Sequence, residues 1–129
     1  MTTLKCDVVV VGGGLAGLAS AYSLARKGVD VVVVERGEFP GAKNVFGGTL
    51  YTALWQKFLP ELAPKMPYER EVTRHLYYMV VDQAYTAVDY QRNVDLLTPP
   101  EGVTILRSRF DSWLANQAEA AGTKIVNSA

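Results

Sequence analysis

The chain has 129 residues, of which 49% are hydrophobic and 20% charged, and this composition excludes a disordered, collagen-like or coiled-coil chain. Its 13 basic and 13 acidic side chains balance, so no net field indicates a nucleic acid or an acidic membrane as a partner. A single cysteine excludes an internal disulfide and is typical of a reducing compartment.

The first predicted elements form a strand–helix–strand unit within residues 6–35. Residues 7–11 are a β-branched run typical of a strand buried on both faces of a parallel sheet. Residues 15–27 predict a helix that Gly28 ends, and residues 31–34 predict a second buried strand that stops at Glu35. The uncharged stretch 8–25 also resembles a secretory signal, but three adjacent glycines interrupt it. We therefore expect a βαβ unit in a cytoplasmic protein that has no transmembrane segment.

The first strand and the helix are joined by a glycine fingerprint, Gly12-Gly13-Gly14-Leu15-Ala16-Gly17. Gly12 permits a tight turn, Gly14 lets the backbone approach a pyrophosphate, and Gly17 lets the helix lie close to the sheet. The N–H groups that open the helix, including those of Leu15 and Ala16, attract an anion. The pattern predicts dinucleotide binding, and the alternative is a glycine turn without a ligand.

An acidic residue at the end of the second strand narrows the choice of dinucleotide. The Glu35 carboxylate would accept both ribose hydroxyls and would repel a 2′-phosphate, which disfavours NADP. The neighbouring Arg36 is the one residue that favours a phosphate there. The fingerprint alone leaves NAD and FAD open.

The middle of the chain predicts a loop, a helix and a hairpin. Residues 36–48 are a glycine-rich loop whose length indicates function. Residues 49–58 predict a helix with its apolar side chains on one side, and three prolines make 60–67 an irregular connection. Residues 73–81 and 84–90 predict an antiparallel hairpin. The remaining predicted elements are a strand at 103–106, a helix at 111–121 and a strand at 124–126.

Two segments favour FAD over NAD as the cofactor, because they resemble segments of a known flavoprotein family. Residues 41–51, GAKNVFGGTLY, resemble the loop after the fingerprint in FixC-type flavoproteins, which are relatives of electron-transfer-flavoprotein:quinone oxidoreductase and of geranylgeranyl reductases. Residues 106–114, LRSRFDSWL, resemble the R-x-x-F-D-x-W-L stretch of that superfamily. The resemblance implies FAD and an α/β fold: a Rossmann-like FAD-binding domain of the glutathione-reductase/PHBH type, with a parallel sheet, helices and a small antiparallel β excursion.

The same resemblance implies a domain organisation. Residues 1–129 would be the N-terminal part of a single FAD-binding domain, left incomplete because the family's later glycine–aspartate block does not follow Arg107. Its parts would be the βαβ unit 6–35, a flavin-proximal loop 36–48, the antiparallel excursion at about 73–90 and a strand–helix–strand unit at 103–126.

The resemblance also carries cofactor roles over to matching residues. The fingerprint glycines would surround the FAD pyrophosphate, Glu35 the adenosine ribose, and Arg36 would lie beside the adenine. The other residues implied to contact the cofactor are Lys43, Asn44, Gly47, Gly48 and Arg107.

Several of these residues have a plain structural alternative. Lys43 would otherwise be a solvated loop lysine, and the pair Gly47-Gly48 a simple turn. Arg107 would otherwise cap the following helix region or pair with Asp111. Asp111 itself is interpreted as a carboxylate that favours the start of a helix.

The implied activity is electron transfer from electron-transfer-flavoprotein subunits through FAD to a quinone or a ferredoxin-like protein. The alternatives are an isoprenoid (geranylgeranyl) reductase or flavin monooxygenase of the same superfamily, a non-catalytic dinucleotide-binding module, and an inactive piece. No catalytic residue and no metal site is predicted, because Cys6 and His75 have no partners in a recognisable motif. A quinone acceptor would be compatible with peripheral contact at the inner face of the membrane.

Overall fold

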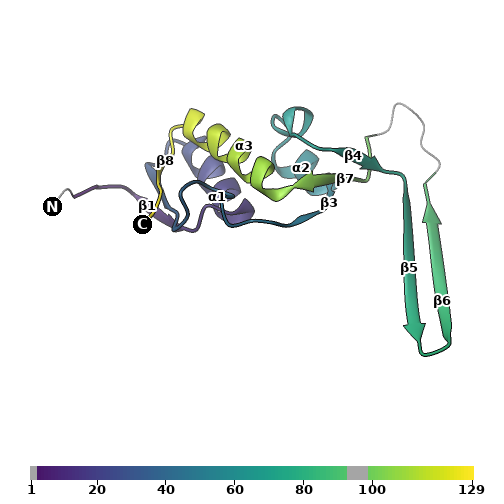
Figure 1. Cartoon of the computed structure of the whole chain (residues 1–129). Helices are drawn as coiled ribbons and strands as arrows, with labels where there is room; N and C mark the ends of the chain where they lie inside the picture. Colours follow the sequence, from purple (N-terminus) through teal and green to yellow (C-terminus); the bar gives the residue numbers. More distant parts are fainter. Residues whose placement is uncertain (1–2, 93–98) are drawn as a thin grey trace. The chain divides into compact units, whose positions relative to one another are not determined.

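The computed structural model describes residues 3–92 and 99–129, and within it the chain forms two compact units (Figure 1). The first unit comprises the residues up to Gly47 together with 106–129, and the second comprises residues 48–105. The assignment of both units to one FAD-binding domain stays a prediction.

A three-stranded parallel sheet is the centre of the first unit. Its strands are β1 (Val8–Val11), β2 (Val31–Val34) and β8 (Lys124–Val126), in the order β1-β2-β8. Val8 pairs with Val31 in one ladder, and Val33 pairs with Ile125 in the other. The helix α1 (Leu15–Ala25) joins β1 to β2, so the predicted parallel βαβ unit is confirmed.

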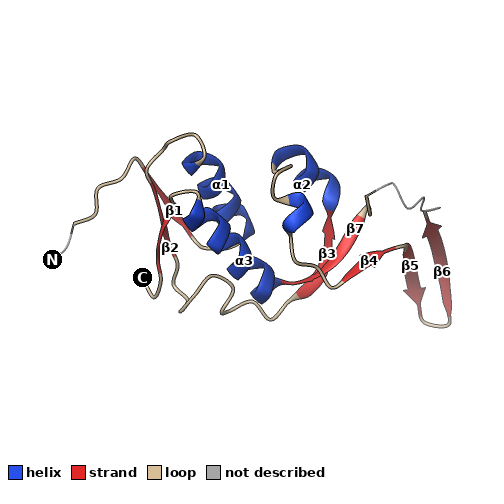
Figure 2. Cartoon of the chain, turned by 90° about the horizontal axis from the view of Figure 1, so that it is seen from above, coloured by secondary structure: helices blue, strands red, loops and turns tan. Residues whose placement is uncertain are grey.

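Two helices contact each other beside this sheet. The helices α1 and α3 (Arg107–Ala120) lie side by side in both ribbon views (Figures 1 and 2). The core between sheet and helix consists of Ala21, Val31 and Val33, with the partly buried Val8, Val10, Leu24, Val29 and Ile125 packed against it. Burial of these aliphatic side chains is the main favourable term in holding α1 on the sheet.

The prediction that β1 is buried on both faces is wrong for this chain. Its residues alternate between half-buried and exposed, and Val9 and Val11 are 56% and 85% exposed. Val8 and Val10 face the core because α1 covers one face of the sheet only.

Helix ends in this unit differ from the predicted ones. Helix α1 ends at Ala25, two residues early, and Gly28 follows with a positive φ of 81°. Helix α3 begins at Arg107 rather than at residue 111, so Arg107 is its first residue and Asp111 lies one turn later.

The second unit contains a three-stranded sheet with the order β3-β7-β4. These strands are β3 (Gly47–Tyr51), β7 (Gly102–Leu106) and β4 (Arg70–Val72), of which β4 and β7 are antiparallel. The short helices α2 (Thr52–Phe58) and η1 (Ala63–Lys65) lie between β3 and β4 in the chain.

The predicted helix at 49–58 is only partly correct. Residues 49–51 belong to β3, and α2 begins at Thr52. Pairing with β7 decides this conformation, and two glycines followed by a β-branched threonine favour a strand over a helix. Within α2, Trp55 is buried, whereas Leu54 and Phe58 are exposed, so the expected common apolar side is not formed.

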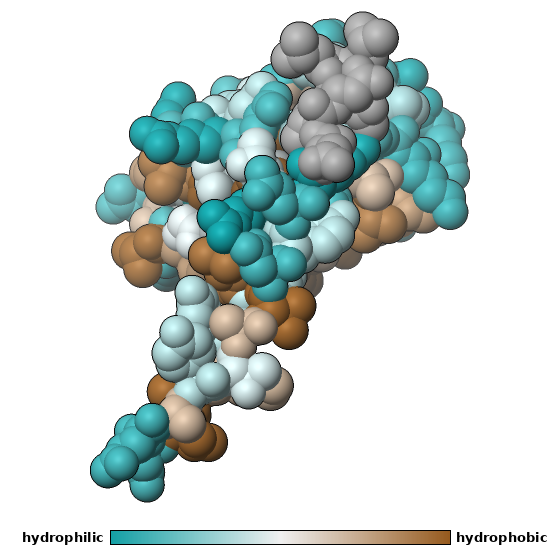
Figure 3. Space-filling view, turned by 90° about the vertical axis from the view of Figure 1, so that its right-hand side faces the viewer, coloured by the Kyte–Doolittle hydropathy of each residue, from teal (hydrophilic) through white to brown (hydrophobic). Residues whose placement is uncertain are grey.

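The predicted hairpin is confirmed in position and direction. Strands β5 (Arg74–Val81) and β6 (Ala84–Gln91) pair antiparallel from Arg74↔Gln91 to Val81↔Ala84. Arg74 donates to Asp89 across the strands, with Nε 2.8 Å from Oδ1. Large apolar side chains stay exposed along the hairpin, among them Met79 at 68% and Val80 at 75% (Figure 3).

These exposed apolar surfaces lead to a first prediction. Expressed by itself, the 129-residue chain should self-associate, because two-stranded ribbons and bare sheet faces with exposed valines recruit further strands. Light scattering after size-exclusion chromatography at several concentrations measures this. The variants Val9→Thr and Val80→Thr keep β-branched side chains and should raise the monomer fraction. A wild-type chain that stays monomeric throughout the concentration series would contradict the prediction.

Candidate cofactor-binding site

The turn between β1 and α1 leaves the start of the helix available to an anion. Gly12 has a φ of 101°, and its N–H donates to the Val34 carbonyl at 2.8 Å, which extends the parallel ladder. Gly14 is the N-cap residue, and no side chain of the described residues caps the helix there. The first turn contains no acidic residue. The first-turn N–H groups of α1 and the positive end of its dipole therefore face the space beside Gly14.

The third glycine of the fingerprint fixes how closely α1 approaches β1. A Cβ placed on Gly17 would lie 2.1 Å from the Gly12 carbonyl oxygen and 3.2 Å from Cγ1 of Val10. No other residue type fits there unless the helix moves away. The close approach keeps the N-terminus of α1 at the end of β1, where the glycine turn is.

Glu35 lies just after β2, and backbone amides hold its carboxylate. Oε1 accepts the Gly37 N–H at 2.6 Å, and Oε2 accepts the Gly13 N–H at 2.7 Å. Both hydrogen bonds lower the pKa of Glu35 below its usual value of 4.5, and the bond from Gly37 has the larger effect of the two. Each carboxylate oxygen has a further lone pair, so the group can still accept hydroxyl donors.

Glu35 also lines a pocket of about 460 Å³ at the end of the parallel sheet. The pocket is lined by Val11, Gly12, Val34, Glu35, Arg36 and Ala129. Arg36 is exposed at this place. The carboxyl ends of parallel strands are where α/β sheets bind their ligands, so this position agrees with the predicted ribose site.

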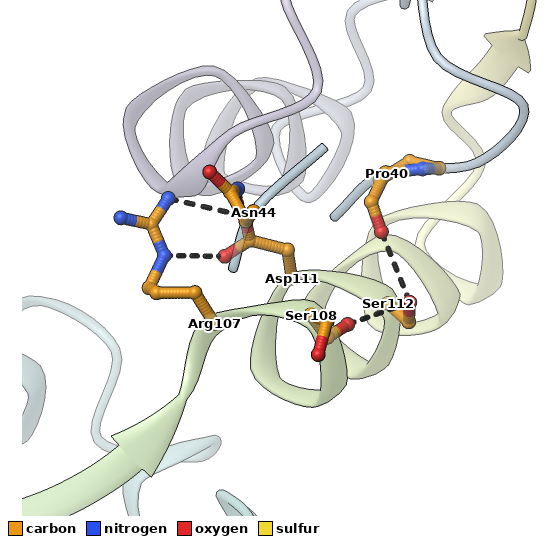
Figure 4. A network of polar contacts seen from close by, with 6 residues as sticks. All are labelled: Pro40, Asn44, Arg107, Ser108, Asp111 and Ser112. Atoms are coloured by element: carbon orange, nitrogen blue, oxygen red, sulfur yellow. Dashed lines mark hydrogen bonds and ion pairs between the residues drawn. The ribbon is translucent and has the colours of Figure 1, made fainter. Parts of the chain in front are cut away.

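The loop after Arg36 is attached to the first turns of α3 (Figure 4). The Ser112 hydroxyl donates to the Pro40 carbonyl at 3.0 Å, and the Arg107 N–H donates to the Phe46 carbonyl at 3.0 Å. Gly41 has a φ of 99°, and a Cβ there would lie 2.7 Å from the Ser108 carbonyl oxygen. The loop backbone therefore lies directly on α3.

A buried carboxylate connects Arg107 with the same loop. Asp111 is fully buried. Its Oδ1 accepts a hydrogen bond from Nε of Arg107 at 2.9 Å, and its Oδ2 accepts one from Nη2 at 3.0 Å. Asn44 of the loop donates its side-chain amide to Oδ2 as well (Figure 4). The structural alternative for Arg107, a pair with Asp111, is thus present. The two-point contact also orients the guanidinium. Its Nη2 lies beside Gly14, 3.8 Å from a Cβ built on that residue.

The predicted site residues separate into three groups by position. The first group lies in or beside the glycine turn and consists of the fingerprint glycines, Leu15, Ala16, Glu35 and Arg107. Asn44 is attached to α3, while Lys43 is exposed and contributes electrostatically to the lowered pKa of Glu35. Gly47 and Gly48 begin strand β3 rather than ending a loop.

The pair of Arg107 and Asp111 is one of the structural alternatives seen in the sequence, but sequence reasoning missed the contact between Asp111 and Asn44. A helix that starts at residue 107 places Arg107 and Asp111 four residues apart on one face, which is a usual spacing for an ion pair. This spacing is visible in the sequence, whereas no local signal marks the contact with Asn44, which is 67 residues away from Asp111. Among the described residues, no group of three or more histidine, cysteine or acidic side chains is arranged to hold a metal ion.

Comparison with known proteins agrees with this geometry. A family model described as "FAD dependent oxidoreductase" matches residues 7–129. Protein FixC of Salmonella typhi is 40% identical over 120 residues, which are 93% of this chain and 28% of FixC. The Escherichia coli K12 protein named "Probable electron transfer flavoprotein-quinone oxidoreductase YdiS" is 38% identical over 126 residues, 98% of this chain and 29% of YdiS.

A solved structure supports the fold. A geranylgeranyl bacteriochlorophyll reductase-like protein from Thermoplasma acidophilum matches with a TM-score of 0.77 and 23% identity, over 95% of this chain and 30% of that chain. The chain thus spans less than a third of the length of each of these proteins. The predicted fold class, the predicted cofactor FAD and the resemblance to FixC-type flavoproteins are confirmed.

A second prediction concerns the close approach at Gly17. Gly17→Ala should lower the free energy of unfolding of the apoprotein by about 1–3 kcal/mol, because the new Cβ pushes α1 from β1. This loss outweighs the helix propensity of alanine, which is about 1 kcal/mol better than that of glycine. Urea titration of the complete protein measures it. Ser20→Ala, exposed on the same helix, is the control and should not destabilise; a G17A midpoint equal to the wild type would refute the packing argument.

A third prediction uses the lowered pKa of Glu35. Because folding lowers this pKa, the carboxylate stabilises the protein above pH 4.5, and the contribution disappears as the pH falls through the folded-state pKa, which lies below 4.5. Glu35→Gln has one acceptor oxygen for two amides, so it should lower the free energy of unfolding by about 1–2 kcal/mol at about pH 7. The difference in free energy of unfolding between variant and wild type should become smaller towards about pH 3, as measured by urea titration at each pH. A gap that stays constant over this range would show that the charge of Glu35 contributes nothing.

Proposed function

This chain belongs to the FAD-dependent oxidoreductase family, and we propose that its glycine turn, Glu35 and Arg107 bind the ADP half of FAD. The observation that carries the proposal is the meeting of two positive groups at Gly14. The uncapped N-terminus of α1 and the guanidinium of Arg107 both lie beside this residue, which has no side chain of its own. A diphosphate fits such a place because backbone N–H groups and a guanidinium both donate to phosphate oxygens.

The ribose end of the site supports the same ligand. Glu35 would accept the two ribose hydroxyls, and the adjoining pocket would take the adenosine near Arg36. Lys43, Asn44, Gly47 and Gly48 would follow the cofactor from the adenine towards the flavin, as the FixC-type resemblance implies. When bound, FAD supplies the electron-transfer chemistry, and the residues of this chain hold and orient it.

For the whole protein we propose electron transfer of the FixC type. Electrons would come from electron-transfer-flavoprotein subunits and leave to a quinone or a ferredoxin-like protein. The support is the identity of 40% to FixC and of 38% to YdiS, a protein named as an electron transfer flavoprotein-quinone oxidoreductase. We place the protein in the cytoplasm, with contact at the inner face of the membrane if the acceptor is a quinone. In the described part of the chain, no helix has both the length and the apolar character needed to cross a membrane.

The alternatives keep the cofactor and change the reaction. An isoprenoid reductase or a flavin monooxygenase would use the same nucleotide site with a different substrate. Likeness to the geranylgeranyl reductase-like structure is at 23% identity and concerns the fold only, so electron transfer is the preferred proposal. Mixing the complete protein anaerobically with reduced electron-transfer flavoprotein should bleach its flavin absorbance, and product analysis with isoprenoid substrates tests the first alternative.

The fourth prediction is that the complete protein purifies with bound flavin and that Arg107 contributes to its affinity. Arg107→Ala should raise the Kd for FAD about 10-fold to 100-fold, the usual cost of losing a charge-assisted hydrogen bond. Arg109→Ala removes the same charge from an exposed position of α3 and should leave the Kd within about twofold, because surface substitutions have small effects. Absorbance of the released flavin gives the stoichiometry, and fluorescence quenching gives the Kd. Colourless protein that cannot be reconstituted with FAD would overturn the proposed function.

A further inference from the structure

Asp111 is a charged side chain in a position where charge is expensive. Its side chain is 0% exposed, in the second turn of α3 between the buried Phe110 and Leu114. Taking a carboxylate out of water costs several kcal/mol unless donors compensate it. Three hydrogen bonds supply this compensation, two from Arg107 and one from Asn44.

The donors come from different parts of the chain. Arg107 lies one turn before Asp111 on α3, whereas Asn44 is 67 residues away in sequence, on the loop that follows β2. Both residues belong to the set that would contact the cofactor. A single acceptor therefore fixes two proposed ligand-binding side chains relative to each other (Figure 4).

The orientation of Arg107 follows from this contact. Asp111 accepts from Nε and Nη2, which together form one edge of the guanidinium, and this two-point contact fixes the plane of the group. A guanidinium has five N–H donors, so three are left that Asp111 does not occupy. The Arg107 side chain is 23% exposed while that of Asp111 is 0% exposed, so the guanidinium is accessible on the side away from the carboxylate. Nη2 lies next to Gly14 at the start of α1.

Stability alone explains this arrangement poorly. Replacing a buried ion pair by apolar side chains is often neutral or stabilising, so such a pair is weak support for a purely structural role. A held guanidinium beside a helix N-terminus is useful to an anionic ligand, because the ligand meets donors that need no ordering.

We infer that Asp111 is a positioning residue of the FAD site, which holds the guanidinium of Arg107 in place for the cofactor, while the amide of Asn44 helps to compensate its buried charge. This inference rests on the proposed function. Because the Asp111 side chain is fully buried, it would act on the cofactor through Arg107 and not by direct contact.

The fifth prediction tests this inference in the complete protein with Asp111→Asn, which has the same shape and lacks the charge. Its Kd should rise about 10-fold or more for FAD and for ADP, and should stay unchanged for adenosine, which has no diphosphate. In the Arg107→Ala background, adding Asp111→Asn should change the Kd for FAD by less than about twofold, because the residue through which it acts is absent. Glu119→Gln, which removes the same charge from an exposed position of α3, is the matched control and should bind like the wild type.

Each outcome has a distinct meaning. If the wild type binds no FAD, the proposed function fails and this inference with it. If the wild type binds FAD and Arg107→Ala weakens it, but Asp111→Asn binds FAD normally, the inference alone is overturned. Equal losses for FAD, ADP and adenosine, or additive losses in the double variant, would show a merely structural role. If Asp111→Asn does not fold, Asp111→Glu keeps the charge, moves the acceptor, and should show the same selective loss for FAD and ADP.

Discussion

The close contact between Gly17 on α1 and the Gly12 carbonyl is the constraint on which the rest of the first unit depends. It allows the helix axis to lie near the sheet, so that Ala21 packs on Val31 and Val33. It also fixes the height of the first helical turn relative to the end of β1. This contact thus determines both how closely α1 packs on the sheet and where the first-turn amide groups of α1 lie. A larger residue at position 17 would disturb both, since its Cβ would collide with the Gly12 carbonyl oxygen in a close-packed interior.

Around this turn, the site is assembled from segments that are distant in sequence. Glu35 reaches back to Gly13, and α3 provides Arg107 next to Gly14. Asp111 then connects α3 with the loop that carries Asn44. Each contact joins a different pair of segments, so the proposed diphosphate site depends on the tertiary fold of the whole first unit and not on the glycine fingerprint alone.

The fold is predictable from the sequence where the pattern is local. The strand β1, the glycine turn, α1 and β2 follow from a β-branched run, three glycines and a second valine run. The hairpin follows from two runs rich in aromatic and β-branched residues. The errors lie where long-range pairing decides. Residues 49–51 have helix-compatible spacing, but pairing with β7 makes them a strand. The position of Arg107 beside Gly14 can be expected only from the family resemblance, and the contact of Asp111 with Asn44 joins residues 67 apart in sequence, for which no local signal exists.

The amide bonds to Glu35 have a consequence for the entropy of binding. A free glutamate side chain loses roughly 1.5–2 kcal/mol of rotamer freedom when it is fixed. Here Gly37 and Gly13 fix both oxygens while the chain folds, so that cost is borne before any ligand arrives. An acceptor that is already ordered loses little motion when a hydroxyl reaches it, and more of the interaction energy remains as affinity. The same rigidity prevents the carboxylate from turning away from an unwanted phosphate, so the preference for an unphosphorylated ribose would be built into the backbone of the glycine turn.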